Sequence, residues 1–574
     1  MNIKYTHNNK DLNLKNIGEK VYLKGWISNK RILGKMIFLN LRDFTGSIQL
    51  IVKSDHFQYQ QILCLKIETV VEIKGLVIER INKNKTSIKN DIEVLITELF
   101  ILSQAQNLPF SINENSIESL EEIRLKYRYL DLRRNEMKSF LIIRHNITQI
   151  IRKNLLINDF LELETPLLSK STPEGARDYL VPSRLYSGKF YALPQSPQIF
   201  KQLYMISGFE RYFQIARCFR DEDLRSDRQP EFTQIDIEAS FLTKKNIMNL
   251  IENIMIDLFQ KIWHKNLSAP FLTLTYEQAI NTYGTDKPDL RFELPIENID
   301  CYLKKEFIKK DIFNGGIRGI KVKKNFLKVN LTNKIINKYK SILKEKYNLN
   351  LFTLKKENQI INGFLSQYID DSSFLNEDEI FFYFHDVLKN QLYINKALGF
   401  IRNQLAQDLN LIDYNKESLL WIIDFPLLEF DVKTNRYYST HHPFTAPKDI
   451  SIFKKNPIKS LAQSYDLVWN GYEIGGGSLR INDYNIQQLM FKNLGFTDSE
   501  IEKKFGFFVE ALKYGTPPHG GIALGLDRLS MLFNKTNNIR NVIGFPKTQG
   551  AKDLMLETPD FVEKEQLKIL NLNY

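Results

Sequence analysis

Cysteine is scarce in this chain: the 574 residues include only Cys64, Cys218 and Cys301, with no C-x-x-C pair. This scarcity excludes a disulfide framework and a thiolate metal cluster, and it favours a reducing, cytoplasmic compartment. Long hydrophobic runs are also missing. The stretch 419–428 is interrupted by an aspartate and a proline, and it is far shorter than the roughly 20 residues of a membrane span. The N-terminal residues hold no apolar core for a signal peptide, so we expect a soluble protein that is not exported.

Glycine and proline are also sparse, at 26 and 18 residues, which excludes a low-complexity chain. The length predicts about four compact units at roughly 150 residues each. The net charge of +12 favours a polyanionic partner. However, the chain is rich in Lys, Asn, Ile, Phe and Tyr, whose codons are rich in A and T. Part of the basicity can therefore reflect genomic base composition, and charge alone does not decide for nucleic-acid binding.

The first hundred residues have the pattern of a small β-barrel. Short alternating segments fill residues 20–53, and further strands are expected near 69–79 and 91–102. Five short strands predict a closed barrel of the OB type, which we assign to residues 1–106. Such barrels stack bases on exposed aromatic side chains, although the same side chains can equally fill the core. The candidates are Tyr22, Trp26, Phe38 and Phe44.

Composition and motif content divide the rest of the chain into four segments. Residues 107–138 read as a hinge, and 139–287, which begins with an amphipathic helix, as the first part of a catalytic domain. Residues 288–418 are dense in Lys and Asn and poor in polar motifs. Motif-rich sequence resumes in 419–574 and ends in a short tail. The simplest organisation is one catalytic domain interrupted by an inserted domain.

Two charged segments could line a ligand pocket. In 171–182, a proline and a glycine mark a turn that would present Glu174 and Arg177. In the strand 232–241, alternation separates two faces. One face carries Phe232, Gln234, Asp236 and Glu238, and the other Ile235, Ile237 and Ala239. The polar face could be the floor of a pocket beside Arg220, or simply a solvent-facing surface.

A glycine-rich segment, 466–480, contains three consecutive glycines, which indicate close approach of a ligand or a broken strand register. Glu473 and Arg480 are seven residues apart and so lie on opposite faces of a regular strand. A shared site therefore requires a β-bulge, expected at 475–477. Asp466 and Glu473 could hold Mg²⁺ with a substrate phosphate, or be ordinary surface carboxylates.

The last motif, 515–533, reads as a loop, a strand at 522–524 and a helix that begins near Asp527. Arg528 would then lie at a helix N-terminus, where an anion is favoured. No G-x-x-x-x-G-K-S/T or G-x-G-x-x-G loop occurs in a strand–turn–helix setting. Neither a P-loop nor a Rossmann site therefore explains Arg220, Arg480 and Arg528.

These segments together resemble the three signature motifs of class II aminoacyl-tRNA synthetases. The motifs are a strand ending at Pro166, the pair Phe219-Arg220 followed by Glu222, and 525–528. Adding 171–182, 195–202, 441–445 and 471–480, nearly the whole chain is similar, in order, to the bacterial aspartyl-tRNA synthetases.

The resemblance implies an α+β architecture: an N-terminal OB-fold barrel, then an antiparallel-sheet catalytic domain with an inserted α/β domain. It implies a homodimer built around 160–166. It also implies a ligase that activates L-aspartate with ATP to aspartyl-adenylate and transfers it to the 3′ end of tRNA(Asp).

The resemblance further implies roles for individual residues. Around aspartate it implies Glu174, Gln198, Lys201, Arg220, Asp236, His441 and Arg480. For ATP it implies Arg220, Asp221, Glu222, Gln229, Phe232, Glu473, Gly525, Leu526, Asp527 and Arg528, with Arg220 as the catalytic residue. For Mg²⁺, as the cofactor with ATP, it implies Asp466 and Glu473. For the tRNA anticodon it implies Arg31, Phe38, Gln49 and Glu93.

Two departures from the family pattern are visible. Ile32 stands where an acidic residue is expected beside the basic turn, and the insertion matches poorly, so no roles are assigned there. Leu33 is associated with discrimination for tRNA(Asp), and a form that also charges tRNA(Asn) is the alternative. Asparaginyl- and lysyl-tRNA synthetases are two further alternatives. A pocket with Lys201, His441 and Arg480 favours a substrate with an anionic side chain and so disfavours both of them. A non-catalytic OB-fold RNA-binding protein is a remote alternative.

Overall fold

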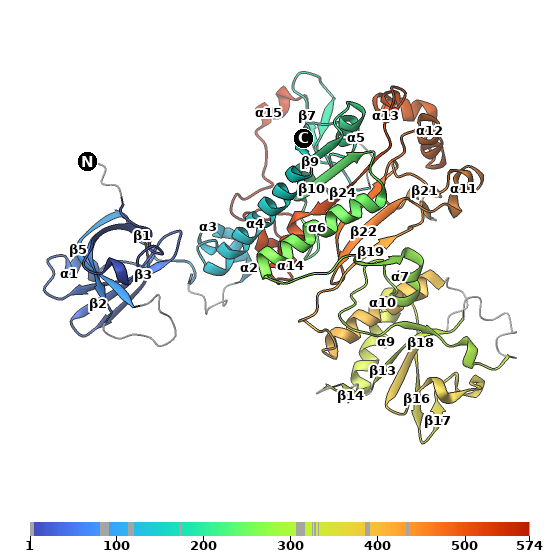
Figure 1. The fold of residues 1–574 in the computed structure, drawn as a ribbon, viewed down its shortest axis with the longest axis horizontal. Coiled ribbons are helices and arrows are strands. Elements are labelled where there is room, and N and C mark those ends of the chain that lie inside the picture. The colour runs from blue at the N-terminus through green and yellow to red at the C-terminus, as the bar shows by residue number, and fades with distance from the viewer. Residues whose placement is uncertain are drawn as a thin grey trace. The chain divides into compact units, whose positions relative to one another are not determined.

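The computed structural model describes residues 5–80, 91–112, 120–171, 175–305, 316–323, 325–326, 329–330, 332–384, 391–431 and 435–572 (Figure 1). The chain divides into two compact units, 1–116 and 117–574. None of the described helices is long and apolar enough to span a bilayer.

The first unit is a closed five-stranded barrel, as the alternating pattern predicts, with strand order β1-β2-β3-β5-β4. Its elements are β1 (Lys20–Leu33), β2 (Met36–Arg42), β3 (Ser47–Lys53), α1 (Tyr59–Leu63), β4 (Val70–Glu79) and β5 (Ile92–Ser103). Alternate side chains such as Leu39, Leu50 and Ile73 are fully buried inside it. Among the candidate aromatics, Tyr22 is buried, Phe38 is half-buried and Phe44 is exposed.

The second unit is built on an eight-stranded sheet of order β11-β19-β22-β23-β24-β10-β9-β6. The strands are β6 (Leu161–Glu162), β9 (Arg211–Phe219), β10 (Glu231–Ser240), β11 (Leu272–Thr275), β19 (Leu419–Ile423), β22 (Ser464–Trp469), β23 (Tyr472–Leu479) and β24 (His519–Gly525). All pairings are antiparallel except β11–β19 and β6–β9, which are parallel and lie at the two edges. The α+β architecture is therefore confirmed.

One face of this sheet is apolar and covered by helices α4 (Asn135–Ile157), α6 (Lys244–Trp263) and α14 (Leu526–Phe533) (Figure 1). The predicted apolar face of β10, with Ile235, Ile237 and Ala239, packs in this core. The other face of β10 is polar, and helix α5 (Gln198–Ile206) packs against that strand. Because one face closes the core, the polar face is left to form a site.

Shorter elements surround the sheet. They are α2 (Glu121–Lys126), α3 (Arg128–Asp131), β7 (Leu180–Pro182), β8 (Phe190–Ala192), α7 (Tyr276–Tyr283), β20 (Leu428–Asp431), β21 (Arg436–Ser439), α11 (Ile450–Lys455), α12 (Tyr484–Asn493), α13 (Asp498–Ala511) and α15 (Lys564–Ile569).

The insertion has a core of its own around an antiparallel sheet of order β12-β13-β18-β16-β17. The strands of this sheet are β12 (Ile296–Asn298), β13 (Arg318–Lys323), β16 (Leu351–Glu357), β17 (Ile360–Asn362) and β18 (Glu379–Phe384). Strands β14 (Asn325–Phe326) and β15 (Val329–Asn330) form a separate two-stranded sheet. Helices α9 (Asn333–Tyr347) and α10 (Gln391–Asp408) pack on it.

The insertion joins the catalytic part through α10 and the segment after α7. The guanidinium of Arg402, which is fully buried, donates to the carbonyls of Asp289, Phe292 and Leu294 at 2.9–3.2 Å. Gly284, with φ +69°, lies so close to α10 that a Cβ would come within 2.1 Å of the Asn395 carbonyl oxygen. The entry to the insertion is therefore fixed by backbone contacts.

Replacing Gly284 by alanine should lower the melting temperature by several degrees, because the left-handed backbone and the clash with α10 add together. Gly208 is the matched control, since its φ is +88° but nothing lies within 4 Å of the added Cβ. Calorimetry of both variants separates the effect of the left-handed backbone from the effect of the clash with α10. Equal shifts for Gly284→Ala and Gly208→Ala would contradict tight packing at the joint.

Candidate active site

The polar face of the sheet forms the floor of a cavity of about 900 Å³. Most of the residues expected around aspartate, ATP and Mg²⁺ line it, although they come from distant segments. They are Gln198, Lys201, Arg220, Glu222, Gln229, Phe232, Asp236, His441, Asp466, Glu473, Arg480, Gly525, Asp527 and Arg528. Tyr347, Lys396 and Phe400 of the insertion line it as well.

Three expected residues are not part of this lining. Glu174 lies outside the described residues. Leu526 packs in the hydrophobic core beneath the sheet, and Asp221 is exposed, with its N–H bonded to the Arg177 carbonyl at 3.1 Å. Asp527 does border the cavity, but its carboxylate accepts from Arg144 and from the Thr233 N–H. It therefore fixes the start of α14 against β10.

A buried network of two cations and two carboxylates lies at one end of the cavity. The Lys201 ammonium is 3.0 Å from Asp236 and 3.3 Å from Glu238. Arg480 donates through Nε and Nη2 to the two oxygens of Glu238, at 2.8 and 3.0 Å. Burial alone would raise the pKa of Glu238, but Arg480 and Lys201 outweigh it and lower the pKa to about 2. Glu238 therefore stays ionised and holds the two cations side by side.

Two polar atoms beside this network have no partner within the described part of the chain. They are Asp236 Oδ2, an acceptor, and Gln198 Nε2, a donor. Buried polar atoms rarely stay unpaired, so these two are suited to a ligand. An ammonium would satisfy the aspartate oxygen, and a ligand oxygen would satisfy the glutamine amide.

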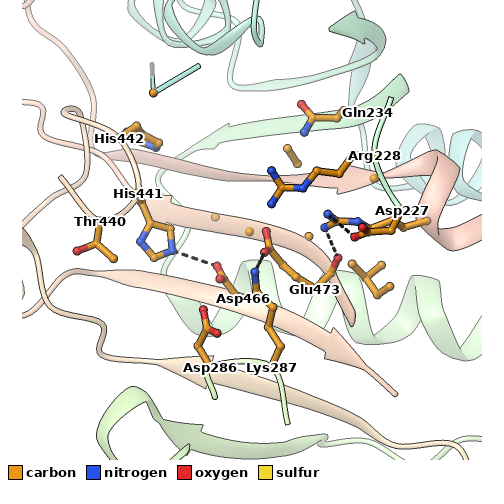
Figure 2. Close-up of a pocket in the computed structure, with 18 of the residues that line it drawn as sticks. Asp227, Arg228, Gln234, Asp286, Lys287, Thr440, His441, His442, Asp466 and Glu473 are labelled. Carbon is orange, nitrogen blue, oxygen red and sulfur yellow. Dashed lines mark hydrogen bonds and ion pairs between the residues drawn. The ribbon is translucent and has the colours of Figure 1, made fainter. Parts of the chain in front are cut away.

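Adjacent histidines border the cavity with opposite pKa shifts. Burial would lower the pKa of His441, but the Asp466 carboxylate, 3.1 Å from Nε2, outweighs it and raises the pKa (Figure 2). Burial, together with Arg480 and His441, lowers the pKa of His442. His441 is thus the more basic member of the pair and His442 the less basic one.

Arginines and an aromatic ring line the neighbouring part of the cavity. The Arg220 guanidinium lies over the Phe232 ring at 5.0 Å. Arg528 donates to the Glu473 carbonyl at 2.9 Å and pairs with Asp227 at 3.1 Å. Gln229 also borders the cavity, but its side-chain amide donates to the Lys547 carbonyl and accepts from the Lys547 N–H.

The glycine-rich strand β23 contains the bulge that a shared site requires, but one residue earlier than expected. Leu467 pairs with Gly475 and Val468 with Glu473, which leaves Ile474 as the extra residue. Glu473 and Arg480 therefore both line the cavity. Gly476 lies between the two candidate metal ligands, since a Cβ there would meet Asp466 Oδ1 at 2.8 Å and Glu473 Oε1 at 3.6 Å.

The comparisons with known proteins agree with this geometry. Residues 120–549 match the model of tRNA synthetases class II (D, K and N), and residues 21–102 match an OB-fold nucleic acid binding domain. The chain belongs to the class II tRNA synthetases.

Curated relatives match over the full length. The chain is 59% identical to the aspartate–tRNA ligase of Aster yellows witches'-broom phytoplasma, covering 100% of this chain and 99% of that one. It is 45% identical to the aspartate–tRNA(Asp/Asn) ligase of Caldanaerobacter subterraneus, covering 99% and 98%. Asparaginyl-tRNA synthetase from Pyrococcus horikoshii shares the fold, with TM-score 0.60, 19% identity and coverage of 95% and 98%.

The barrel of this class II synthetase brings its four expected anticodon residues onto one face. A bulge in β1 between Ile27 and Asn29 sets Arg31 opposite Phe38 on β2. On the adjoining strands, Gln49 donates to Glu93 at 2.7 Å. Burial raises the pKa of Glu93 although this hydrogen bond opposes it. Ile32 and Leu33, next to Arg31, are exposed.

Sequence reasoning missed several side chains that the synthetase site contains. The alternation of β10 predicts only that Gln234 and Glu238 lie on the polar face of the strand. In the structure, Glu238 also pairs with both buried cations, Lys201 and Arg480. Lys287 was placed at a domain boundary, but its ammonium is 2.7 Å from Glu473 Oε2. Burial would raise the pKa of Glu473, and Lys287 and Arg528 instead lower it to about 2. An isolated lysine before a proline carries no signal that could reveal this contact.

Replacing Asp466 by asparagine should lower the pKa of His441, because burial then acts without the opposing carboxylate. An NMR titration of histidine-labelled protein measures this shift, with His441→Gln used for assignment. Asp286→Asn is the control, since Asp286 borders the same cavity without a bond to His441. An unchanged His441 pKa in Asp466→Asn would contradict the assigned ion pair.

Proposed function

We propose that this protein activates L-aspartate with ATP to aspartyl-adenylate and transfers the aspartyl group to the 3′ end of tRNA(Asp). The observation that carries the proposal is the buried set Lys201, Arg480, Asp236 and Glu238. The full-length similarity to two aspartate–tRNA ligases supports the same reaction.

The charges of this set match the substrate. Lys201 and Arg480 would receive the side-chain carboxylate of aspartate, because a guanidinium fork and an ammonium are the strongest partners for that group. The unpartnered Asp236 oxygen would accept from the α-ammonium. The resemblance also assigns Gln198 and Glu174 to this group, and Glu174 lies outside the described residues. A neutral asparagine side chain would offer Lys201 and Arg480 no carboxylate, and a cationic lysine side chain would be repelled by both.

The nucleotide would occupy the neighbouring part of the cavity. Phe232 and Arg528 would offer one aromatic and one cationic face for adenine, and Arg220 would bind the α-phosphate; all three side chains line the cavity. The α-carboxylate of aspartate attacks the α-phosphorus of ATP, the bond from that phosphorus to the bridging oxygen breaks, and pyrophosphate leaves. Arg220 stabilises the charge that develops on the phosphate oxygens, so catalysis rests on positioning and electrostatics.

The donor set at Asp466 and Glu473 fits Mg²⁺, because two carboxylates flank Gly476, where a side chain would fill the space. Mg²⁺ typically takes one or two carboxylates and completes its coordination with water and substrate phosphates. When bound, it would neutralise charge on the leaving phosphates. The two carboxylates would hold it, and Arg528 and Lys287 flank Glu473.

Two further features belong to the proposal. The barrel face with Arg31, Phe38, Gln49 and Glu93 would read the anticodon, with Phe38 stacked on a base. A homodimer would form around 160–166, where large apolar side chains are exposed: Leu156, Ile157, Leu161, Leu167 and Leu168. The free cysteines are compatible with a cytoplasmic location.

Amino-acid-dependent ATP–pyrophosphate exchange tests the first step without tRNA. Exchange should occur with aspartate and not with asparagine or lysine. Arg220→Ala should reduce it by at least roughly a hundredfold, since removing a transition-state charge partner costs several kcal/mol, while tRNA binding is retained. Exchange at the normal rate in Arg220→Ala would refute the catalytic assignment, and no exchange by the unaltered protein would refute the proposed reaction.

Replacing Phe38 by alanine should weaken tRNA charging about tenfold or more, because a base stack contributes roughly 1–3 kcal/mol. Pyrophosphate exchange should not change. Phe57→Ala is the control, since Phe57 is an exposed phenylalanine of the same unit that lies outside the proposed face. Equal loss in charging and exchange for Phe38→Ala would contradict a separate anticodon site.

A second specificity is raised by the names of several relatives, which refer to both tRNA(Asp) and tRNA(Asn). Charging of the two purified tRNAs by the same preparation distinguishes these alternatives. We expect charging of tRNA(Asp) alone, from the leucine at position 33.

A further inference from the structure

Lys287 lies in the short segment between α7 and the insertion, and it borders the proposed ATP site. Its ammonium is 2.7 Å from Glu473 Oε2 (Figure 2). Glu473 is the same carboxylate that is suited to Mg²⁺. Burial would lower the pKa of Lys287, but Glu473 and Asp286 outweigh it, so the side chain stays charged.

Lys287 and a metal ion at Gly476 would draw on the same carboxylate, through different oxygens. The lysine bonds the oxygen Oε2, while Oε1 faces Gly476 and Asp466. A divalent cation on Glu473 would repel the ammonium, which must then find another anion. The groups that arrive with the metal are the phosphates of the nucleotide. A Lys ammonium is a common point-charge partner for phosphate.

The backbone that carries Lys287 is held from both sides. Gly284, three residues earlier, is packed against α10, and Arg402 donates to the Asp289 carbonyl at 2.9 Å. A Cβ on Gly471 would lie 3.2 Å from the Asp289 side chain and 3.8 Å from the Lys287 carbonyl. The ammonium can therefore move by side-chain rotation, while its backbone stays at the rim of the cavity.

We propose that Lys287 binds the ATP polyphosphate, and that it stands in for the metal on Glu473 until the metal nucleotide arrives. The insertion fixes the segment that carries Lys287, so it contributes to nucleotide binding through this residue. This assignment rests on the proposed ATP-dependent function of the same cavity.

Two variants and one control test the assignment on the full-length protein. Lys287→Gln removes the charge, and Lys287→Arg keeps it. Lys396→Gln is the matched control, because Lys396 borders the same cavity and no carboxylate pairs with it among the described residues. Calorimetry measures binding of α,β-methylene-ATP with Mg²⁺ and of AMP, and electron paramagnetic resonance measures Mn²⁺ binding without nucleotide.

Lys287→Gln should weaken binding of the ATP analogue about tenfold, as expected for the loss of one charge-assisted contact, and leave AMP binding unchanged. The same variant should bind Mn²⁺ several-fold more tightly, because its competitor is gone. Lys287→Arg should retain most of the affinity for the analogue, and Lys396→Gln should behave as the unaltered protein. A general loss of structure would weaken all three ligands together, so opposite changes for nucleotide and metal identify the proposed role.

Three results would overturn the assignment while leaving the proposed function intact. They are normal binding of the ATP analogue by Lys287→Gln, equal losses for the analogue and AMP, or weaker Mn²⁺ binding. A different result, in which the unaltered protein binds no ATP and catalyses no exchange with aspartate, would overturn the proposed function and this assignment together.

Discussion

The buried charge network of Lys201, Asp236, Glu238 and Arg480 is the constraint on which the site depends. Each charge is buried and has at least one opposite charge within 3.3 Å. Burying such groups is costly unless partners satisfy them, and removal of one member leaves an uncompensated charge. The network therefore fixes α5 against β10 and against Arg480, which directly follows β23, and it keeps two cations close together at one end of the cavity.

The sheet makes this arrangement possible by separating its two faces. The apolar face of β10 closes the core under α4, α6 and α14, so its polar face is free to carry carboxylates. The bulge at Ile474 then brings Glu473 and Arg480 into one cavity, and glycines allow the strands β23 and β24 to approach closely. Stability and the site thus use opposite faces of the same strands.

The insertion is part of this arrangement although its own motifs are weak. Gly284 of the catalytic part contacts Gly399 of helix α10, and Arg402 of the same helix donates to the carbonyl of Asp289 at the start of the insertion. The segment between them carries Lys287 to Glu473. A domain without recognisable catalytic residues can therefore influence the site by fixing the path of the chain that enters it.

The sequence by itself determined the barrel, the two faces of β10, the helix at Asp527 and the family, because these follow from local periodicity and from motifs of adjacent residues. It also indicated that a bulge was needed near the glycines. Only the tertiary structure decided which charges pair: Glu238 with Lys201 and Arg480, and Lys287 with Glu473. These partners are far apart in the chain, and one sequence by itself does not show which distant side chains come close together in the fold. The same reason explains why Leu526, inside a signature motif, belongs to the core and not to the cavity.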